Sequence, residues 1–158
     1  MVNIIVQLSK YLMIVLIIMY TYLCFSIFGY YDPDKKDRCL KKQNVLMFVM
    51  HLTAFLVMFL VKLDIKILAL YLMQVTLLGG TIVLYMFIYP RVSRLVVNNM
   101  CMLLSIGFIM ITRLNYDKAA KQYLIAAGGL VLCMVIPVII RKFKLLSEWR
   151  IFYGVLGI

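Results

Sequence analysis

Long apolar runs alternate along this chain with short segments that carry Lys and Arg. Five runs are long enough to form membrane helices, because about 20 apolar residues cross a hydrocarbon core of roughly 30 Å. We expect spans at residues 11–29, 44–61, 67–89, 95–112 and 123–140. A sixth run, Ile151–Ile158, is too short to cross. The pattern therefore predicts the front part of a longer multi-span protein.

The polar segments between the runs are expected to be loops. They cover residues 30–43, 62–66, 90–94, 113–122 and 141–150. Asp32-Pro33 is a turn signal, and Pro90 should end the third span because proline has no backbone N–H to donate. The spans should be helices, since backbone in lipid must satisfy its own hydrogen bonds and these runs lack the alternation of barrel strands. The predicted fold class is an all-α transmembrane helix bundle with five complete spans and a truncated sixth.

The composition supports a membrane location. Hydrophobic residues make up 66% of the chain, charged residues make up 15%, and the mean hydropathy is +1.04. A soluble domain is less apolar and carries charge throughout its sequence. The net charge of +11 then reflects the retention of cytoplasmic loops and contact with anionic lipid heads. Nucleic acid is not expected as a partner, because the sequence predicts no soluble scaffold that would present a basic face.

The distribution of Lys and Arg predicts the orientation of the chain. Loops one, three and five together carry 11 of the 17 Lys and Arg residues, and the N-terminal stretch with loops two and four carries the other 6. The side with more cations is normally cytoplasmic. We therefore expect the N-terminus and the segments around Lys62 and Arg113 to face outward. The N-terminus lacks the pattern of a cleavable signal peptide, so the first run is interpreted as a retained span.

Few residues inside the runs offer chemistry. The four cysteines form no CxxC pair and the twelve methionines have no fixed spacing, so neither set predicts a disulfide framework or a metal site. His51 is the single histidine, and we expect it to bond to a neighbouring helix rather than to bind a metal or relay protons. Gln74 and Thr76 can likewise bond across helices. The Gly79-Gly80 and Gly128-Gly129 pairs favour close helix packing or a bend.

The most structured polar segment is Arg113–Gln122. Asn115 is a predicted N-cap of the fifth span, and Asp117 would lie in its first turn, four residues before Lys121 and able to pair with it. Arg113, Lys118 and Lys121 would then gather at one membrane surface. Two interpretations remain open: ordinary interfacial anchoring, or contact with an anionic lipid-linked substrate, whose phosphates Arg and Lys bind well.

The C-terminal third resembles a known family. The segment 102–114, with Gly107, Met110 and Arg113, resembles the first core helix of the RodA/FtsW/SpoVE (SEDS) proteins. Ala119-Ala120-Lys121-Gln122 and the following helix with Gly128 look like the start of their second core helix, and 140–149 is similar to their cytoplasmic link to the third. The resemblance covers about residues 100–158. It divides the chain into an extension of three helices, residues 1–94, and an incomplete core, residues 95–158.

The resemblance implies a protein of bacterial cell-wall synthesis, cell shape or cell division that polymerises lipid II as a peptidoglycan glycosyltransferase. It implies a class B penicillin-binding protein (a transpeptidase) as partner, beside the lipid bilayer and the lipid-linked substrate. The family's catalytic Asp lies in a large outer loop late in the chain. No such loop is found here, so no catalytic residue is transferred and this chain is expected to need no cofactor, although a divalent cation could serve the full-length form.

The matching positions are candidates for two roles. Substrate-side contacts are assigned to Arg113, Lys118, Lys121 and Gln122, and helix packing to Gly107, Gly128 and Gly129. One alternative is a small accessory or scaffold protein without catalysis. Another is a small transporter, including a lipid II flippase, but such proteins show buried charges or broken helices near mid-membrane, and these runs show almost none.

Overall fold

A computed structural model describes the backbone of residues 2–142, and it describes the side chains from Ile4 to Ile139. These residues form α1 (Val2–Ser26), the 3₁₀ turn η1 (Ile27–Gly29), α2 (Pro33–Lys62), α3 (Ile65–Ile88), α4 (Arg94–Leu114) and α5 (Tyr116–Lys142). No strand occurs in this part of the chain. The predicted all-α fold is therefore confirmed, and all five helices are long and apolar enough to cross a membrane. The expected sixth run lies outside the described residues.

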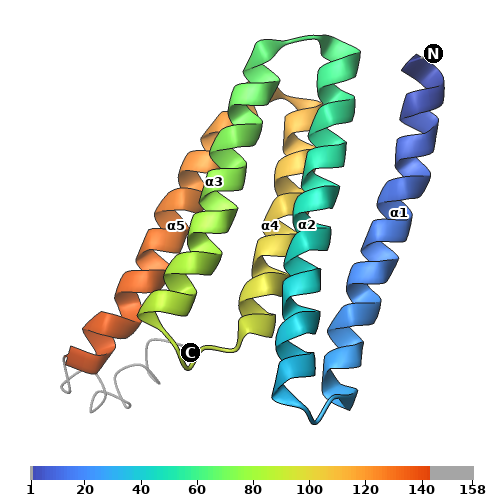
Figure 1. The fold of residues 1–158 in the computed structure, drawn as a ribbon. Helices are drawn as coiled ribbons and strands as arrows, with labels where there is room; N and C mark the ends of the chain where they lie inside the picture. The colour runs from blue at the N-terminus through green and yellow to red at the C-terminus, as the bar shows by residue number, and fades with distance from the viewer. Residues whose placement is uncertain (1, 143–158) are drawn as a thin grey trace, which may run out of the picture. The chain divides into compact units, whose positions relative to one another are not determined.

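The chain divides into two compact units, residues 1–123 and 124–158. In the first unit, α2 is central and contacts α1, α3 and α4, and α3 also contacts α4 (Figure 1). Successive helices run in opposite directions, so the turns after η1 and α3 lie at one end and the α2–α3 turn at the other (Figure 1). This arrangement matches the predicted alternation of loops.

Two of the predicted loops are wrong, because much of each is helix. The segment 30–43 was expected to be a loop, but α2 begins at Pro33. Asp32 caps it by accepting a bond from the Asp34 N–H at 3.0 Å, and Pro33 suits the first turn, where no N–H partner is needed. Polar residues here therefore do not mark the end of the helix.

The segment 113–122 was mistaken for a loop for the same reason. Arg113 and Leu114 belong to α4, and α5 begins at Tyr116, so Asn115 alone separates the two helices. The predicted N-cap is confirmed, since the Asn115 Oδ1 accepts a bond from the Lys118 N–H at 3.1 Å. The expected ion pair between Asp117 and Lys121 does not form in the part of the chain that the structure describes. The ion pairs of that part all involve Asp37, in the first turns of α2.

The other two turns are short and defined by single residues. Leu63 ends α2 in the left-handed conformation, with φ of 50°, and Asp64 caps α3 by accepting from the Lys66 N–H at 2.9 Å. The third span ends at Ile88, two residues before Pro90, as expected.

Candidate functional site: a buried polar seam and an open groove

A line of polar residues runs along the inner face of α4. Asn98, Ser105 and Thr112 are each seven residues apart and no more than 3% exposed. Residues at this spacing fall on the same side of a helix, here the side that packs on α2 and α3. Asn98 and Ser105 bond to other helices, as described next, whereas Thr112 donates to the Phe108 carbonyl of α4 itself at 2.7 Å. We call this line the polar seam of an otherwise apolar bundle.

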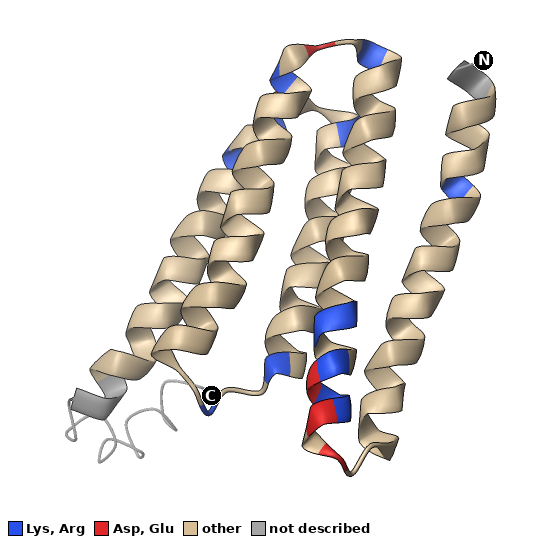
Figure 2. Ribbon diagram, viewed as in Figure 1, with Lys and Arg blue, Asp and Glu red and all other residues tan. Residues whose placement is uncertain are grey.

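At its lower end in the view of Figure 2, the seam joins α4 to the charged start of α2. Asp37 pairs with Lys41 at 2.7 Å and with Arg94, the first residue of α4, at 2.6 Å. Figure 2 shows the acidic and basic positions that gather at this end of α2 and the basic position at the start of α4. Both cations are exposed, so each pair contributes at most about 1 kcal/mol. One turn further along α4, the Asn98 side-chain amide donates to the Leu40 carbonyl at 3.2 Å and to Gln43 Oε1 at 3.1 Å. These bonds fix the register of α2 against α4.

The same end holds α1 through a second set of bonds. The Tyr20 hydroxyl donates to Asn99 Oδ1 at 3.0 Å, and the Cys24 thiol donates to the same oxygen at 3.2 Å. The Gln43 amide donates to the Cys24 sulfur at 3.6 Å, so α1, α2 and α4 share one network. This network and the packing of α1 on α2, which buries Leu16 and Tyr20, attach α1 to the bundle, although α1 exposes most of its apolar side chains.

His51 occupies the middle of the bundle and is fully buried. Its Nδ1 is 2.8 Å from Ser105 Oγ on α4, and its ring lies 4.8 Å from Phe55 and 5.7 Å from Tyr71 of α3, between ring centroids. The histidine thus links three helices, and the expectation that it bonds to a neighbouring helix is confirmed. Its Nε2 has no hydrogen-bond partner among the described residues.

Gln74 and Thr76 do not make the cross-helix bonds that were expected. Thr76 donates to the Met73 carbonyl of its own helix at 2.9 Å. Gln74 is fully buried, and neither atom of its amide has a partner in the described part of the chain. Gln74 is buried because it lies on the inner face of α3 between Leu70 and Leu78, whose apolar side chains pack into the bundle.

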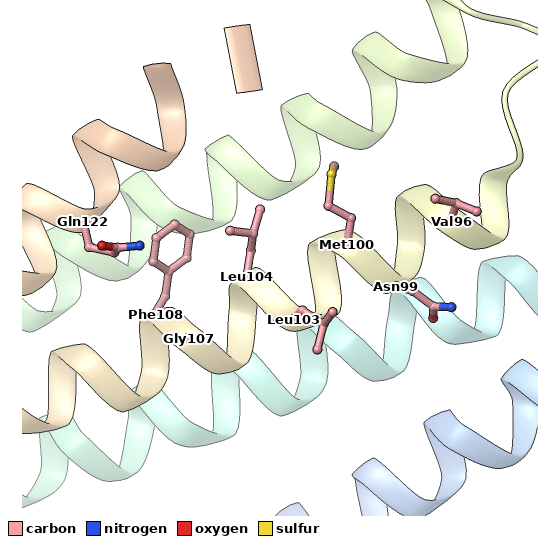
Figure 3. Close-up of a pocket in the computed structure, with 8 residues that line it drawn as sticks. All are labelled: Val96, Asn99, Met100, Leu103, Leu104, Gly107, Phe108 and Gln122. Carbon is pink, nitrogen blue, oxygen red and sulfur yellow. The ribbon is translucent and has the colours of Figure 1, made fainter. Parts of the chain in front are cut away.

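A groove of about 640 Å³ lies along the other side of α4 (Figure 3). It is lined by Val96, Asn99, Met100, Leu103, Leu104, Gly107, Phe108 and Gln122 (Figure 3). The lining is apolar apart from two amides, Asn99 near the start of α4 and Gln122 in the second turn of α5. No atom lies within 4 Å of a Cβ built at Gly107, so the groove is open at that point. Its chemistry suits a hydrocarbon chain.

The predicted substrate-side residues lie near one another along the chain but differ in setting. Arg113, in the last turn of α4, and Lys118 and Lys121, in the first two turns of α5, are all exposed, whereas Gln122 lines the groove. We call the three cations and Asn115 between them the cationic junction. Gly107 and Gln122, both named from the family resemblance, therefore meet at one surface. Their role in substrate contact stays a prediction.

The glycines were proposed for helix packing. A Cβ at Gly79 would lie 3.8 Å from Phe48 of α2, an ordinary contact between α2 and α3. Beside Gly107, Gly128 and Gly129 no atom of the described chain lies that close, and their packing role stays a prediction. Among the described residues no group of three or more His, Cys, Asp or Glu side chains could hold a metal ion.

Sequence reasoning missed the seam itself. The spacing of Asn98, Ser105 and Thr112 is visible in the sequence and is typical of a buried helix face. Ser and Thr are common in membrane helices, so Ser105 and Thr112 do not stand out from the rest of the run.

The fold defines the class of protein: an all-helical chain compatible with a multi-pass membrane protein. No family model, curated protein or solved structure matches it.

Proposed function

We propose that this chain is the N-terminal part of a SEDS-like protein of bacterial cell-wall synthesis, whose full-length form polymerises lipid II. The observation that carries the proposal is the groove on α4. It brings Gly107 and Gln122, two positions that match the family pattern, to one apolar surface, and Gln122 directly follows Lys121 of the cationic junction.

The groove and the junction together suit a lipid-linked pyrophosphate. A polyprenyl tail needs an apolar surface that opens to lipid, and the groove supplies one along three turns of α4. The pyrophosphate needs cations at the membrane surface, and Arg113, Lys118 and Lys121 are exposed there. Charge-assisted hydrogen bonds to phosphate run about 1.5–3 kcal/mol when well formed, so two contacts suffice for selective binding.

The proposal places the protein in the bacterial plasma membrane with its N-terminus and the cationic junction outside. The Lys and Arg excess at the opposite end supports this orientation. In a background without the four native cysteines, we expect Asn115→Cys to react with an impermeant thiol reagent in intact cells. Ser93→Cys, an exposed position in the turn at the other end, should react only after lysis. The reverse labelling pattern would refute the orientation.

We expect Arg113→Gln with Lys121→Gln to weaken the use of lipid II about fivefold per residue. Both cations are exposed, so water weakens each phosphate contact to about 1 kcal/mol, below the value of a well-formed buried bond. Polymerisation rate is measured against lipid II concentration with the full-length protein. Binding of fluorescent lipid II to the 158-residue chain in nanodiscs is measured in parallel. Gly107→Leu should weaken the binding too, because the leucine side chain has room to enter the groove and fill it.

The matched control is Lys62→Gln with Lys66→Gln. It removes two exposed cations from the α2–α3 turn and leaves the junction and the groove intact. Lipid II use should then stay normal. Two results would leave interfacial anchoring as the role of the junction cations. One is an equal loss of lipid II use in both double variants. The other is normal kinetics when Arg113→Gln with Lys121→Gln is normally inserted in the membrane. An absence of lipid II binding to the wild-type chain would favour the accessory-protein alternative.

A further inference from the structure

α2 is longer than the hydrocarbon core that it crosses. Its 30 residues span about 45 Å at 1.5 Å per residue, against a core of roughly 30 Å. The apolar part occupies the C-terminal two thirds of the helix. The first three turns, Pro33–Lys42, therefore continue as helix into the headgroup layer, and they carry five of the chain's cations (Figure 2).

One face of α2 points away from the bundle along its whole length. Its residues follow one another at intervals of three or four, the spacing of one side of a helix. We call this face the outer stripe; it consists of Lys35, Arg38, Lys42, Val45, Val49, Leu52, Leu56 and Leu60. All eight are exposed, and the five apolar members are between 38% and 61% exposed. The bonds of α2 to α1 and α4 leave from other sides, through Asp37, Gln43 and His51.

The outer stripe changes from charged to apolar at one point along its length. Its first three residues are cations, and the remaining five are aliphatic. Two carboxylates adjoin the cations in sequence: Asp34 precedes Lys35, and Asp37 precedes Arg38. Asp37 pairs with Lys41 and Arg94, which are not on the stripe, and Asp34 forms no ion pair in the part of the chain that the structure describes. Among the described residues, no ion pair neutralises Lys35, Arg38 or Lys42. Arg38 donates from Nε to the backbone carbonyl of Asp34 at 3.4 Å, a neutral acceptor that leaves the guanidinium free to bind a phosphate through its other nitrogens.

We propose that the outer stripe binds an anionic phospholipid of the surrounding leaflet. The headgroup phosphate lies against Lys35, Arg38 and Lys42, and an acyl chain runs along the aliphatic residues from Val45 onward. The order of the stripe, cations at the surface and aliphatic residues below, matches the head-to-tail order of a lipid in the same membrane. An acidic protein segment would match the cations but would leave Val49 and Leu52 without a partner.

The test uses the full chain reconstituted in vesicles of phosphatidylcholine with spin-labelled phosphatidylglycerol or spin-labelled phosphatidylcholine as probe. The motion-restricted fraction of each probe gives its relative affinity for the protein surface. We expect wild-type protein to prefer phosphatidylglycerol on the order of fivefold, the effect of about one well-placed cation at a membrane surface, with the preference falling in 1 M salt. The triple variant should show almost no preference, with an affinity ratio of phosphatidylglycerol to phosphatidylcholine close to one. It combines Lys35→Gln, Arg38→Gln and Lys42→Gln.

Two control variants separate the stripe from total charge and from folding. Lys36→Gln, Lys62→Gln and Lys66→Gln remove three exposed cations that lie off the stripe, and the preference should persist. Lys35→Arg with Lys42→Arg keeps the charge and should also preserve it. Equal losses in both triple variants, or no preference in the wild type, would overturn the proposal. Circular dichroism of every variant confirms that the helices are intact.

Discussion

His51→Ala is expected to lower the free energy of unfolding of the bundle by about 3 kcal/mol, since it removes a buried ring and leaves a cavity among three helices. The lost contacts are those with Phe55 and Tyr71 and the bond to Ser105. His51→Phe keeps the volume and the ring contacts, so it should cost only about 1 kcal/mol, the range of one hydrogen bond between membrane helices. Unfolding in detergent mixtures of increasing dodecyl sulfate content measures both values.

The neighbouring residue supplies the control for this result. Leu52 is 47% exposed on the outer face of the same helix, and Leu52→Ala should change stability by less than about 1 kcal/mol. A double-mutant cycle of His51→Phe with Ser105→Ala isolates the hydrogen bond. If His51→Phe costs as much as His51→Ala, the bond rather than the packing dominates, and our division of the energy is wrong.

Gln74→Leu is expected to act in the opposite direction and to stabilise the bundle by about 1–2 kcal/mol. A buried amide without partners loses its bonds to water on folding, which costs roughly 1–3 kcal/mol, and leucine of similar volume removes that cost. The gain depends on the amide reaching water in the unfolded state, as it does in dodecyl sulfate. The same detergent titration measures it.

Thr76→Val is the matched control, since Thr76 is exposed and bonds only to its own helix. It should change stability by a few tenths of a kcal/mol. A fall in stability on Gln74→Leu would contradict the prediction, because it would mean that the amide is bonded in the folded protein.

The cationic first turns of α2 and α5 are where the sequence prediction differs from the structure. Charge density predicts loops at residues 30–43 and 113–122, yet both segments are largely helical. Lys, Arg and Asp near a membrane surface are compatible with helix, because the backbone stays hydrogen-bonded inside the helix in water as well as in lipid. Hydropathy locates the membrane boundary, whereas caps such as Asp32 and Asn115 locate the ends of the helix.

The sequence by itself determined the number, type and alternation of the apolar helices, because the length of an apolar run is set against the thickness of the bilayer. It also identified His51 as a residue that bonds between helices. Only the tertiary structure decided which residues from different helices meet. Asn98 bonds to Gln43, His51 bonds to Ser105, and Gly107 and Gln122 line one groove. Lipid offers the same solvent to every side of a helix, so hydropathy alone does not say which face packs inward. That choice depends on the fit of side chains from helices far apart in the chain.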